Sequence, residues 1–427
     1  MAQPRHASSY YEATALSAPR RAPVDEPLEC DVCVVGGGIA GCSTALHLAE
    51  RGYRVVLLEE HRIGWGASGR SGGQVLPGTA AGQAALERLA GRALARAVWD
   101  ISVEGVALVR ALISRYAIAC DWVSGHLQAA LRPRQDGELR AELVRLEREY
   151  GYCAVRYVTQ EELRSLLETS RYLGALYDTN AGHLHPLNYT LGLAAAAERH
   201  GARLFEQSAA LGFSGDAARL LVRTARAEVR CRFLALCANA RLGKVAPELT
   251  SKIMAVGSCL VATAPLGAER ARRLIANDAA VADMNWVLDY FRRSADHRLL
   301  FGGRVTYSGF DPARIAASTR RRMLGVFPQL ADAPIEFAWG GYLDITVNRA
   351  PHFGRIAPNV YFLQGFSGHG LALAGIAGKL LAEAIAGQAE RFDVFARIPH
   401  RDFPGGRLLS RPALVLAMLY YRLKDLL

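Results

Sequence analysis

A glycine cluster between two apolar stretches near the N-terminus restricts the fold of this chain more than any other feature. The stretch Cys30-Asp-Val-Cys-Val-Val35 predicts a buried strand, and Gly36-Gly-Gly38-Ile-Ala-Gly41 after it fits the pattern G-x-G-x-x-G. Ile39 to Gly52 then has helical periodicity, and Arg54-Val-Val-Leu-Leu58 predicts a second strand. A strand, a tight turn, a helix and a second strand within about 30 residues form a βαβ crossover, so we expect an α/β fold built on a parallel sheet.

The spacing of these glycines is typical of a turn that holds a dinucleotide. Gly36 permits the tight turn, Gly38 lets the backbone approach a pyrophosphate, and Gly41 lets the helix pack closely on the strand. Glu59 ends the second strand, where its carboxylate can accept hydrogen bonds from both ribose hydroxyls. NAD and FAD both satisfy this pattern. The predicted ADP-binding residues are Gly36, Gly38, Ile39, Ala40, Gly41, Glu59 and Glu60.

A second glycine-rich loop follows soon after Glu59, with the sequence Ile63-Gly-Trp-Gly-Ala-Ser-Gly-Arg-Ser-Gly-Gly-Gln74. Such a loop can run along an elongated ligand and offer backbone N–H groups to its far end. This segment helps to decide between NAD and FAD.

The rest of the chain predicts further helices and strands, over a length that suits two or three domains. Helical spacing of Ala, Leu, Glu and Arg predicts helices over 82–115 and 138–169. Near the C-terminus, residues 360–364 predict a strand, Gly365-Phe-Ser-Gly-His-Gly370 a turn, and 371–385 a helix, so a strand, a glycine turn and a helix occur at both ends. Other predicted strands are 233–237, 258–263, 286–292 and 298–301.

Charge and cysteine content exclude some classes of function. The net charge is +11, but the arginines that carry it are dispersed and often lie near acidic residues, so nucleic acid is not expected as a ligand, whereas an anionic small substrate is compatible. The single Cys30-x-x-Cys33 pair falls within a predicted strand, so we expect free thiols and no metal. No apolar leader and no run of ~20 apolar residues is present, which predicts a cytoplasmic protein without a transmembrane span. Residues 412–427 predict an amphipathic helix that packs on its own domain or contacts a membrane surface or another subunit.

Several of these segments resemble, in the same order along the chain, the D-amino-acid oxidase (DAO) superfamily of flavoproteins, which includes glycine oxidase and sarcosine oxidase. The resemblance implies an α/β (α+β) two-domain fold, in which a Rossmann-like FAD-binding domain carries an inserted substrate domain on a mixed or antiparallel sheet. The matching segments are Cys33-Val-Val-Gly-Gly-Gly-Ile-Ala-Gly41, Gly66-Ala-Ser-Gly-Arg-Ser-Gly-Gly-Gln74, Gly182-His-Leu-His-Pro-Leu-Asn188, Leu299-Leu-Phe-Gly-Gly303, Trp339-Gly-Gly-Tyr-Leu-Asp-Ile-Thr346 and Gly365-Phe-Ser-Gly-His-Gly-Leu371.

The resemblance also implies a division into domains. Residues 28–100, 180–247 and 336–398 would form a discontinuous FAD-binding domain, 101–179 and 248–335 the substrate-binding domain, and 399–427 a C-terminal amphipathic tail. The helix that begins near Leu371 would direct its positive end at the flavin, where reduction leaves negative charge. By resemblance the flavin-contacting residues are Ala67, Ser68, Gly69, Arg70, Gly72, Gly73, Gln74, Gly365, Gly368, His369, Gly370 and Leu371.

The function implied is that of an FAD-dependent amine oxidase acting on CH–NH or CH–NH2 groups, with O2 reduced to H2O2. Gamma-glutamylputrescine or a related polyamine derivative is the expected substrate. The alternatives are an oxidase or dehydrogenase of a cyclic or N-alkyl amino acid such as pipecolate or sarcosine, and an RNA-associated flavoprotein.

The substrate site is predicted from residues near the implied flavin position. The wider family often carries an arginine after its Trp-x-Gly motif, but Trp339-Gly-Gly-Tyr342 has none there, which argues against a simple α-amino acid. Arg292 or Arg349 would then be the carboxylate clamp if one exists. The residues expected at the chemistry are His369, Tyr290 and Tyr342, and those expected at the substrate are Phe291, Arg292 and His185.

Overall fold

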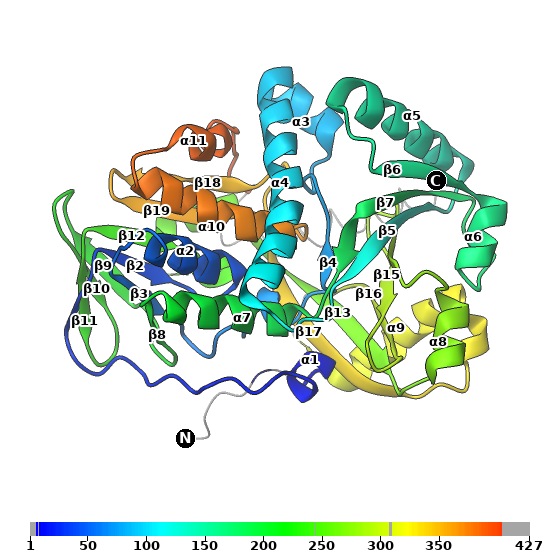
Figure 1. Cartoon of the computed structure of the whole chain (residues 1–427), viewed down its shortest axis with the longest axis horizontal. Helices are drawn as coiled ribbons and strands as arrows, with labels where there is room; N and C mark the ends of the chain where they lie inside the picture. The colour runs from blue at the N-terminus through cyan, green and yellow to red at the C-terminus, as the bar shows by residue number, and fades with distance from the viewer. Residues whose placement is uncertain (1–5, 7, 244, 307–309, 404–427) are drawn as a thin grey trace.

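The computed structural model describes residues 6, 8–243, 245–306 and 310–403 of the 427-residue chain. Two halves, each built on a large sheet, lie side by side, and helix α4 (Arg92–Tyr116) stands between them (Figure 1). The mixed α/β architecture expected from the sequence is confirmed.

The first half is built on a six-stranded sheet with the order β18-β19-β12-β2-β3-β8. All neighbouring strands are parallel except β18 and β19. Helix α2 connects β2 to β3, and Val32 lies opposite Val55, which confirms the predicted βαβ unit. The elements are β2 (Val32–Val35), α2 (Ile39–Ala49), β3 (Val55–Leu58), β8 (Arg203–Phe205), β12 (Phe233–Leu236), β18 (His352–Ala357) and β19 (Val360–Gln364).

Both faces of this sheet are covered, which explains why β2 and β3 are unbroken apolar runs. Val32 and Val34 face a core shared with helices, whereas Cys33 and Val35 face a core shared with a four-stranded sheet. The helical layer contains α2, α4, α7 (Pro186–Arg199), α10 (Leu371–Ile385) and α11 (Glu390–Ala396). The four-stranded sheet has the order β1-β11-β10-β9, with β1 (Leu28–Glu29), β9 (Gly212–Gly215), β10 (Leu220–Arg223) and β11 (Glu228–Cys231).

The second half is built on a nine-stranded mixed sheet with the order β17-β13-β16-β15-β14-β5-β7-β4, and β6 pairs with β7. Only β14 and β5 are parallel among these strands. The strands are β4 (Gln74–Val75), β5 (Val123–Ala130), β6 (Val155–Thr159), β7 (Gly174–His183), β13 (Met254–Thr263), β14 (Ala280–Asp283), β15 (Tyr290–Arg293), β16 (Leu299–Thr306) and β17 (Ile335–Ile345).

Short helices cover one face of this second sheet, and their apolar side chains join it in one core. The opposite face is turned toward α4 and the first half (Figure 1). The remaining helices are α1 (Tyr10–Ala13), α3 (Gln83–Ala90), α5 (Pro133–Tyr150), α6 (Gln160–Leu166), α8 (Ala268–Leu274) and α9 (Pro312–Val326).

Of three local predictions, two are wrong and one is confirmed. The stretch 138–169 is not helical throughout, because Gly151 ends α5 with a φ of 63° and the chain then forms β6 before α6. The prediction of helices over 82–115 is confirmed by α3 and α4, which Gly91 separates with a φ of 85°. The strand predicted from residue 286 begins only at Tyr290.

The predicted domain boundaries stay a proposal. Two elements pack against the half of the molecule to which these boundaries do not assign them. Helix α4 packs on α10 of the first half, although a boundary at 101 assigns most of it to the second. Strand β17 pairs with β13 in the second sheet, although a boundary at 336 assigns it to the first. The helix predicted over 412–427 lies outside the described residues.

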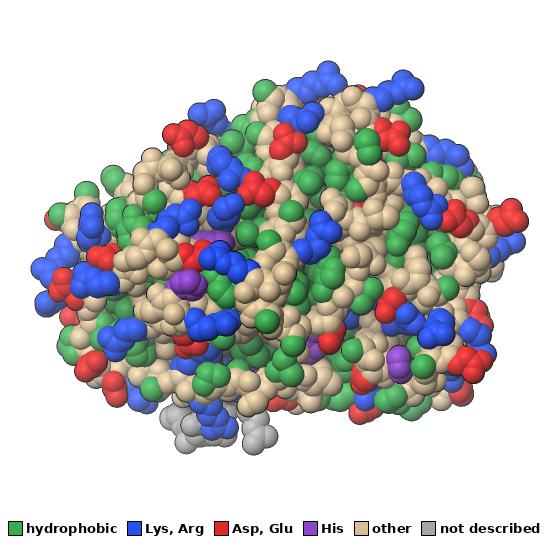
Figure 2. All heavy atoms as spheres, viewed as in Figure 1, with side chains coloured by type: hydrophobic (Ala, Val, Ile, Leu, Met, Phe, Trp, Pro, Cys, Tyr) green, Lys and Arg blue, Asp and Glu red, His purple; other side chains and the backbone are tan. Residues whose placement is uncertain are grey.

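The surface and the cysteines agree with the composition. Figure 2 shows basic side chains interspersed with acidic ones on one face. All eight cysteines are free, and all but the exposed Cys153 are buried. In the described ranges no single helix has the length and apolar character to cross a membrane, although the bent pair α10 and α11 meets both criteria when taken together.

Candidate active site

A cavity of about 1540 Å³ lies between the two halves and is lined by both glycine turns. It is larger than the roughly 300–1,000 Å³ of a pocket for a drug-sized ligand, so it suits an extended cofactor together with a substrate. Sixteen of the predicted cofactor residues line it, whereas Gly41, Gly69 and Gly365 do not. Those that line it are Gly36, Gly38, Ile39, Ala40, Glu59, Glu60, Ala67, Ser68, Arg70, Gly72, Gly73, Gln74, Gly368, His369, Gly370 and Leu371.

The first glycine turn is packed so closely that side chains would not fit. A Cβ on Gly36, whose φ is 108°, would lie 2.7 Å from the carbonyl oxygen of Cys237. A Cβ on Gly41 would lie 1.9 Å from the carbonyl oxygen of Gly36, so Gly41 acts from behind the cavity wall. Gly38 is the N-cap of α2 and makes no side-chain cap, which leaves the positive end of the helix directed into the cavity.

Glu59 lies at the end of β3, beside this turn. Its carboxylate accepts hydrogen bonds from the backbone N–H groups of Gly37, at 2.7 Å, and His61, at 2.8 Å. Burial raises the pKa of Glu59 to about 7, against the lowering effect of these two bonds.

The second loop joins the first turn to the second half of the molecule. The hydroxyl of Ser68 accepts a hydrogen bond from the N–H of Ile39 at 3.0 Å. Arg70 donates to the carbonyls of Trp65, at 2.7 Å, and Gly340, at 3.2 Å, and its guanidinium lies 4.1 Å from the centre of the Trp65 ring. Burial lowers the pKa of Arg70 to about 10.

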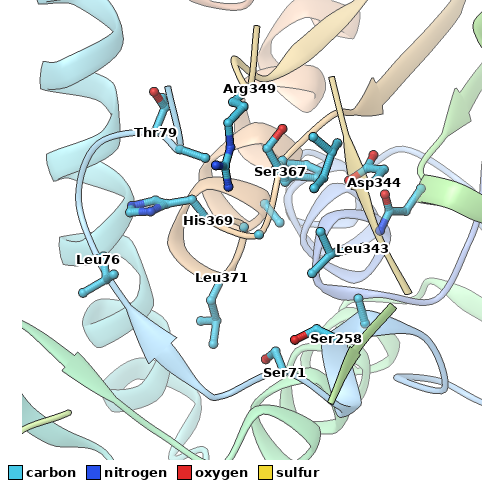
Figure 3. Close-up of a pocket in the computed structure, with 18 of the residues that line it drawn as sticks. Ser71, Leu76, Thr79, Ser258, Leu343, Asp344, Arg349, Ser367, His369 and Leu371 are labelled. Carbon is cyan, nitrogen blue, oxygen red and sulfur yellow. The ribbon is translucent and has the colours of Figure 1, made fainter. Parts of the chain in front are cut away.

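The third loop precedes α10 and lines the same cavity as the second. The carboxylate of Asp344 accepts a hydrogen bond from the N–H of Gly365, and burial raises the pKa of Asp344 to about 6. His369 Nε2 lies 2.8 Å from the carbonyl oxygen of Pro77, so this ring ties the loop to the segment after β4 (Figure 3). Burial lowers the pKa of His369, and the ring is therefore neutral near pH 7. Helix α10 begins at Leu371 without a side-chain cap.

These features fit FAD. Two helix N-termini border the cavity, where they favour a pyrophosphate and an anionic flavin ring. Several cavity-lining polar atoms are buried without a hydrogen-bond partner among the described residues, and a bound molecule would supply one. These atoms are Gln83 Oε1, His126 Nε2, Asn239 Oδ1 and Asn285 Oδ1.

The predicted catalytic and substrate residues separate into two groups. The side chains of Tyr290, Tyr342 and His369 line the cavity. The hydroxyl oxygen of Tyr290 lies 3.2 Å from the hydroxyl oxygen of Ser258. Phe291 points to the opposite face of β15, into the core with the short helices, because successive side chains on a strand alternate. The roles of these residues stay predictions.

Arg292 and His185 also lie outside the cavity lining. Arg292 is 4% exposed and donates to the carbonyls of Gly72 and Leu184 and to the hydroxyl of Tyr11. Because these bonds hold the guanidinium group of Arg292 against the second loop, Arg292 supports the cavity wall. His185 caps α7, since its Nδ1 accepts from the N–H of Asn188 at 3.1 Å.

The sequence interpretation missed His126, Thr79 and Gln83 in the wall. His126 lies on β5 and burial lowers its pKa to about 3, so it is neutral. Thr79 and Gln83 follow β4, and both are less than 9% exposed. His126 is a polar residue within an apolar stretch, and this pattern could have marked it as a site residue. Because the sequence predicted helices on both sides of this stretch, it did not show where the strand would lie in the fold.

Comparison with known proteins agrees with this geometry. A family model described as DAO, FAD dependent oxidoreductase, matches residues 31–384. The chain is 42% identical over 424 residues to the gamma-glutamylputrescine oxidoreductase of Escherichia coli (strain K12), covering 98% of both chains. It is 38% identical over 425 residues to a probable oxidoreductase, OrdL, of Haemophilus influenzae, covering 98% of this chain and 97% of the other.

Solved structures share the fold. The glycine oxidase of Bacillus cereus superposes with a TM-score of 0.71 at 20% identity, covering 87% of this chain and 99% of that one. This likeness confirms the fold expected from the resemblance.

Proposed function

This chain belongs to the DAO family of FAD-dependent oxidoreductases, and from that premise we propose that it oxidises the primary amine of gamma-glutamylputrescine or of a related polyamine derivative. One observation carries the proposal: the cavity that both glycine turns line is also lined by Tyr290 and by apolar side chains of α4 and α5. The identity to the relative whose name states this substrate supports the choice.

The reaction removes two electrons and two protons from the CH–NH2 group, giving an imine that water hydrolyses to an aldehyde and ammonia. When bound, FAD supplies the hydride acceptor, and O2 finally takes the two electrons to give H2O2. The chain's own residues bind and orient the amine, keep it neutral and exclude bulk water.

The apolar part of the cavity wall suits a flexible aliphatic chain. Trp99, Leu139, Leu146 and Leu176 are buried and line the cavity, so methylene groups of an amine would replace water there. Tyr290 adds an aromatic wall, and burial raises the pKa of its hydroxyl, so it stays protonated and can donate a hydrogen bond.

The amine must lose its ammonium proton before a hydride can leave the adjacent carbon. A desolvated site disfavours the charged form, and the positive end of α10 does the same. Burial lowers the pKa of His369 and of His126, so both rings are neutral near pH 7 and add no charge to the cavity.

The test is a peroxide assay of the purified flavoprotein in air with gamma-glutamylputrescine, putrescine, sarcosine and pipecolate. We expect the highest kcat/KM with gamma-glutamylputrescine. A preference for sarcosine or pipecolate would contradict the proposal and favour an N-alkyl or cyclic amino acid as substrate.

A further inference from the structure

The opening of the cavity carries exposed apolar side chains. Trp286 is 39% exposed, Tyr342 43% and Val347 46%, and all three line the cavity. An exposed side chain that also lines a cavity lies where the cavity meets solvent. A substrate that enters there with its reacting amine first would keep its other end near this rim.

Arg349 lines the cavity at the same rim. Its guanidinium lies 5.7 Å from the centre of the Trp286 ring, and Figure 3 shows the side chain extending into the pocket toward His369. The charge of Arg349 contributes, after burial, to the lowered pKa of His369, which agrees with this proximity.

The loop that carries Arg349 is held by hydrogen bonds on both sides. Arg349 has a φ of 59°, a conformation that non-glycine residues adopt rarely and that persists where the surroundings fix it. The hydroxyl of Thr346 donates to the carbonyl of Ala350 at 2.8 Å, and Asn348 donates to the carbonyl of Pro399 at 2.8 Å. The loop therefore presents this arginine from a fixed backbone.

Thr79 supplies a second, independent observation. It is 7% exposed and lines the cavity, and its hydroxyl oxygen has no hydrogen-bond partner within the described part of the protein. A buried hydroxyl without a partner is costly, which indicates that a ligand completes it. A carboxylate can accept a bidentate pair of bonds from a guanidinium and a further bond from a hydroxyl.

We propose that Arg349 and Thr79 form a subsite for a carboxylate carried by the substrate at the end remote from its reacting amine. The proposal rests on the proposed function and narrows it: the enzyme prefers amines with a distal carboxylate, as in a glutamyl group, over otherwise identical amines without one. This arginine lies on the loop between β17 and β18, away from the Trp339-Gly-Gly motif.

A matched pair of substrates tests the subsite. Gamma-glutamylputrescine and N-(4-aminobutanoyl)putrescine differ only in the carboxylate. We expect Arg349→Met to lower kcat/KM for the first by about 10- to 100-fold, mainly through KM, and to change the second by less than about twofold. Arg349→Lys should restore part of the loss, and Thr79→Val should give a smaller loss confined to the first substrate. Arg226→Met, in the exposed turn between β10 and β11, is the control.

Other outcomes overturn the subsite. An equal loss for both substrates, with a shifted flavin reduction potential, would place Arg349 on FAD instead. No change in Arg349→Met would show that the carboxylate binds elsewhere.

Binding without turnover separates this proposal from the proposed function. Gamma-glutamylbutylamide lacks the reacting amine, and its dissociation constant can be measured from the spectrum of the oxidised flavin. We expect about 10- to 100-fold weaker binding to Arg349→Met than to the wild type. If the wild type oxidises neither amine, the proposed function fails while this titration still decides the subsite. Equal affinity of the wild type and Arg349→Met for gamma-glutamylbutylamide, or no binding of this amide to either protein, overturns the subsite.

Discussion

Glu59 illustrates how the fold sets the chemistry of a residue that the sequence could place. The βαβ pattern and the glycine spacing predicted its position at the end of a strand, and the structure places it there. Its pKa of about 7 arises from burial in the wall of the cavity, which no pattern in the sequence reports.

This pKa predicts a pH-dependent affinity for FAD. The carboxylate is the better acceptor for ribose hydroxyls, so FAD binding should favour ionised Glu59 and lower its pKa. Because Glu59 in the FAD-free protein gains a proton as pH falls below about 7, FAD affinity should then fall by up to about tenfold per pH unit. Titration of the FAD-free protein with FAD at about pH 6 and about pH 8 measures the two affinities. Glu59→Gln should remove the difference, and an unchanged pH dependence in that variant would contradict the role.

The residues around the substrate were less predictable. Period-2 alternation puts either Tyr290 or Phe291 toward the cavity, but the sequence does not say which face of β15 is inside. Arg292 was expected to meet substrate because arginines bind carboxylates. In the structure Arg292 instead donates hydrogen bonds to Gly72, Leu184 and Tyr11. These three residues are distant from Arg292 in the sequence, so the sequence did not reveal the contacts.

At the scale of elements, the glycine turns and the strands of the parallel sheet were the most predictable parts. The boundaries of β19 and α10 agree with the predicted 360–364 and 371–385. Strand β6 was missed because its five residues lie between two helices of similar composition, and only pairing with β7 reveals it. Helix α1 was missed because a helix of four residues has almost no periodicity.

Close packing of α2 on β2 predicts that Gly41→Ala abolishes FAD binding. The added Cβ would lie 1.9 Å from the backbone oxygen of Gly36. A backbone atom cannot move aside as a flexible side chain could. We expect a loss of about 1–3 kcal/mol in the free energy of unfolding and purification without flavin. Gly137→Ala in α5 is the matched control, because its Cβ would meet nothing within 4 Å. That variant should gain roughly 0.5–1 kcal/mol, and a flavin-loaded, stable Gly41→Ala protein would disprove the packing argument.

Helix α1 predicts that the N-terminal segment supports the cavity wall. Tyr11 is fully buried, and its hydroxyl accepts a bond from Arg292 at 3.1 Å. Tyr11→Ala should cost about 3–5 kcal/mol in urea unfolding, by analogy with other large aromatic truncations. Tyr11→Phe keeps the ring and should cost about 1.5–3 kcal/mol, the range for a bond to a charged group. Equal stability of all three proteins would mean that α1 does not pack as described.

At the scale of the whole molecule, buried titratable groups predict how stability changes with pH. Burial lowers the pKa of four histidines to about 3, so the unfolded chain binds more protons below about pH 6.5 and the folded state loses stability there. Burial raises the pKa of three acids to about 6 or 7, so the folded state binds more protons between about pH 4 and 7 and this opposes the loss. The histidines are His126, His183, His185 and His352, and the acids are Glu59, Asp283 and Asp344.

Burial also lowers the pKa of His6 and His400 to about 4, so the histidines outnumber the acids. We therefore expect stability to fall as the pH drops below about 6.5, and to fall more steeply below about pH 4.5, where the acids are protonated in both states. Each histidine contributes up to about 1.4 kcal/mol per pH unit. Urea unfolding between about pH 4 and 7 measures the curve. A fall that is as steep at about pH 6 as it is below about pH 4.5 would contradict the opposing effect of the acids.

The cavity between the two halves links the fold to the proposed reaction, and anaerobic reduction of the bound flavin tests that link most directly. Gamma-glutamylputrescine is added to the purified holoprotein without oxygen while the visible absorbance of the flavin is followed. The account predicts rapid bleaching, and recovery of the colour with one H2O2 per flavin when air is admitted. A flavin that stays oxidised with this amine would contradict it.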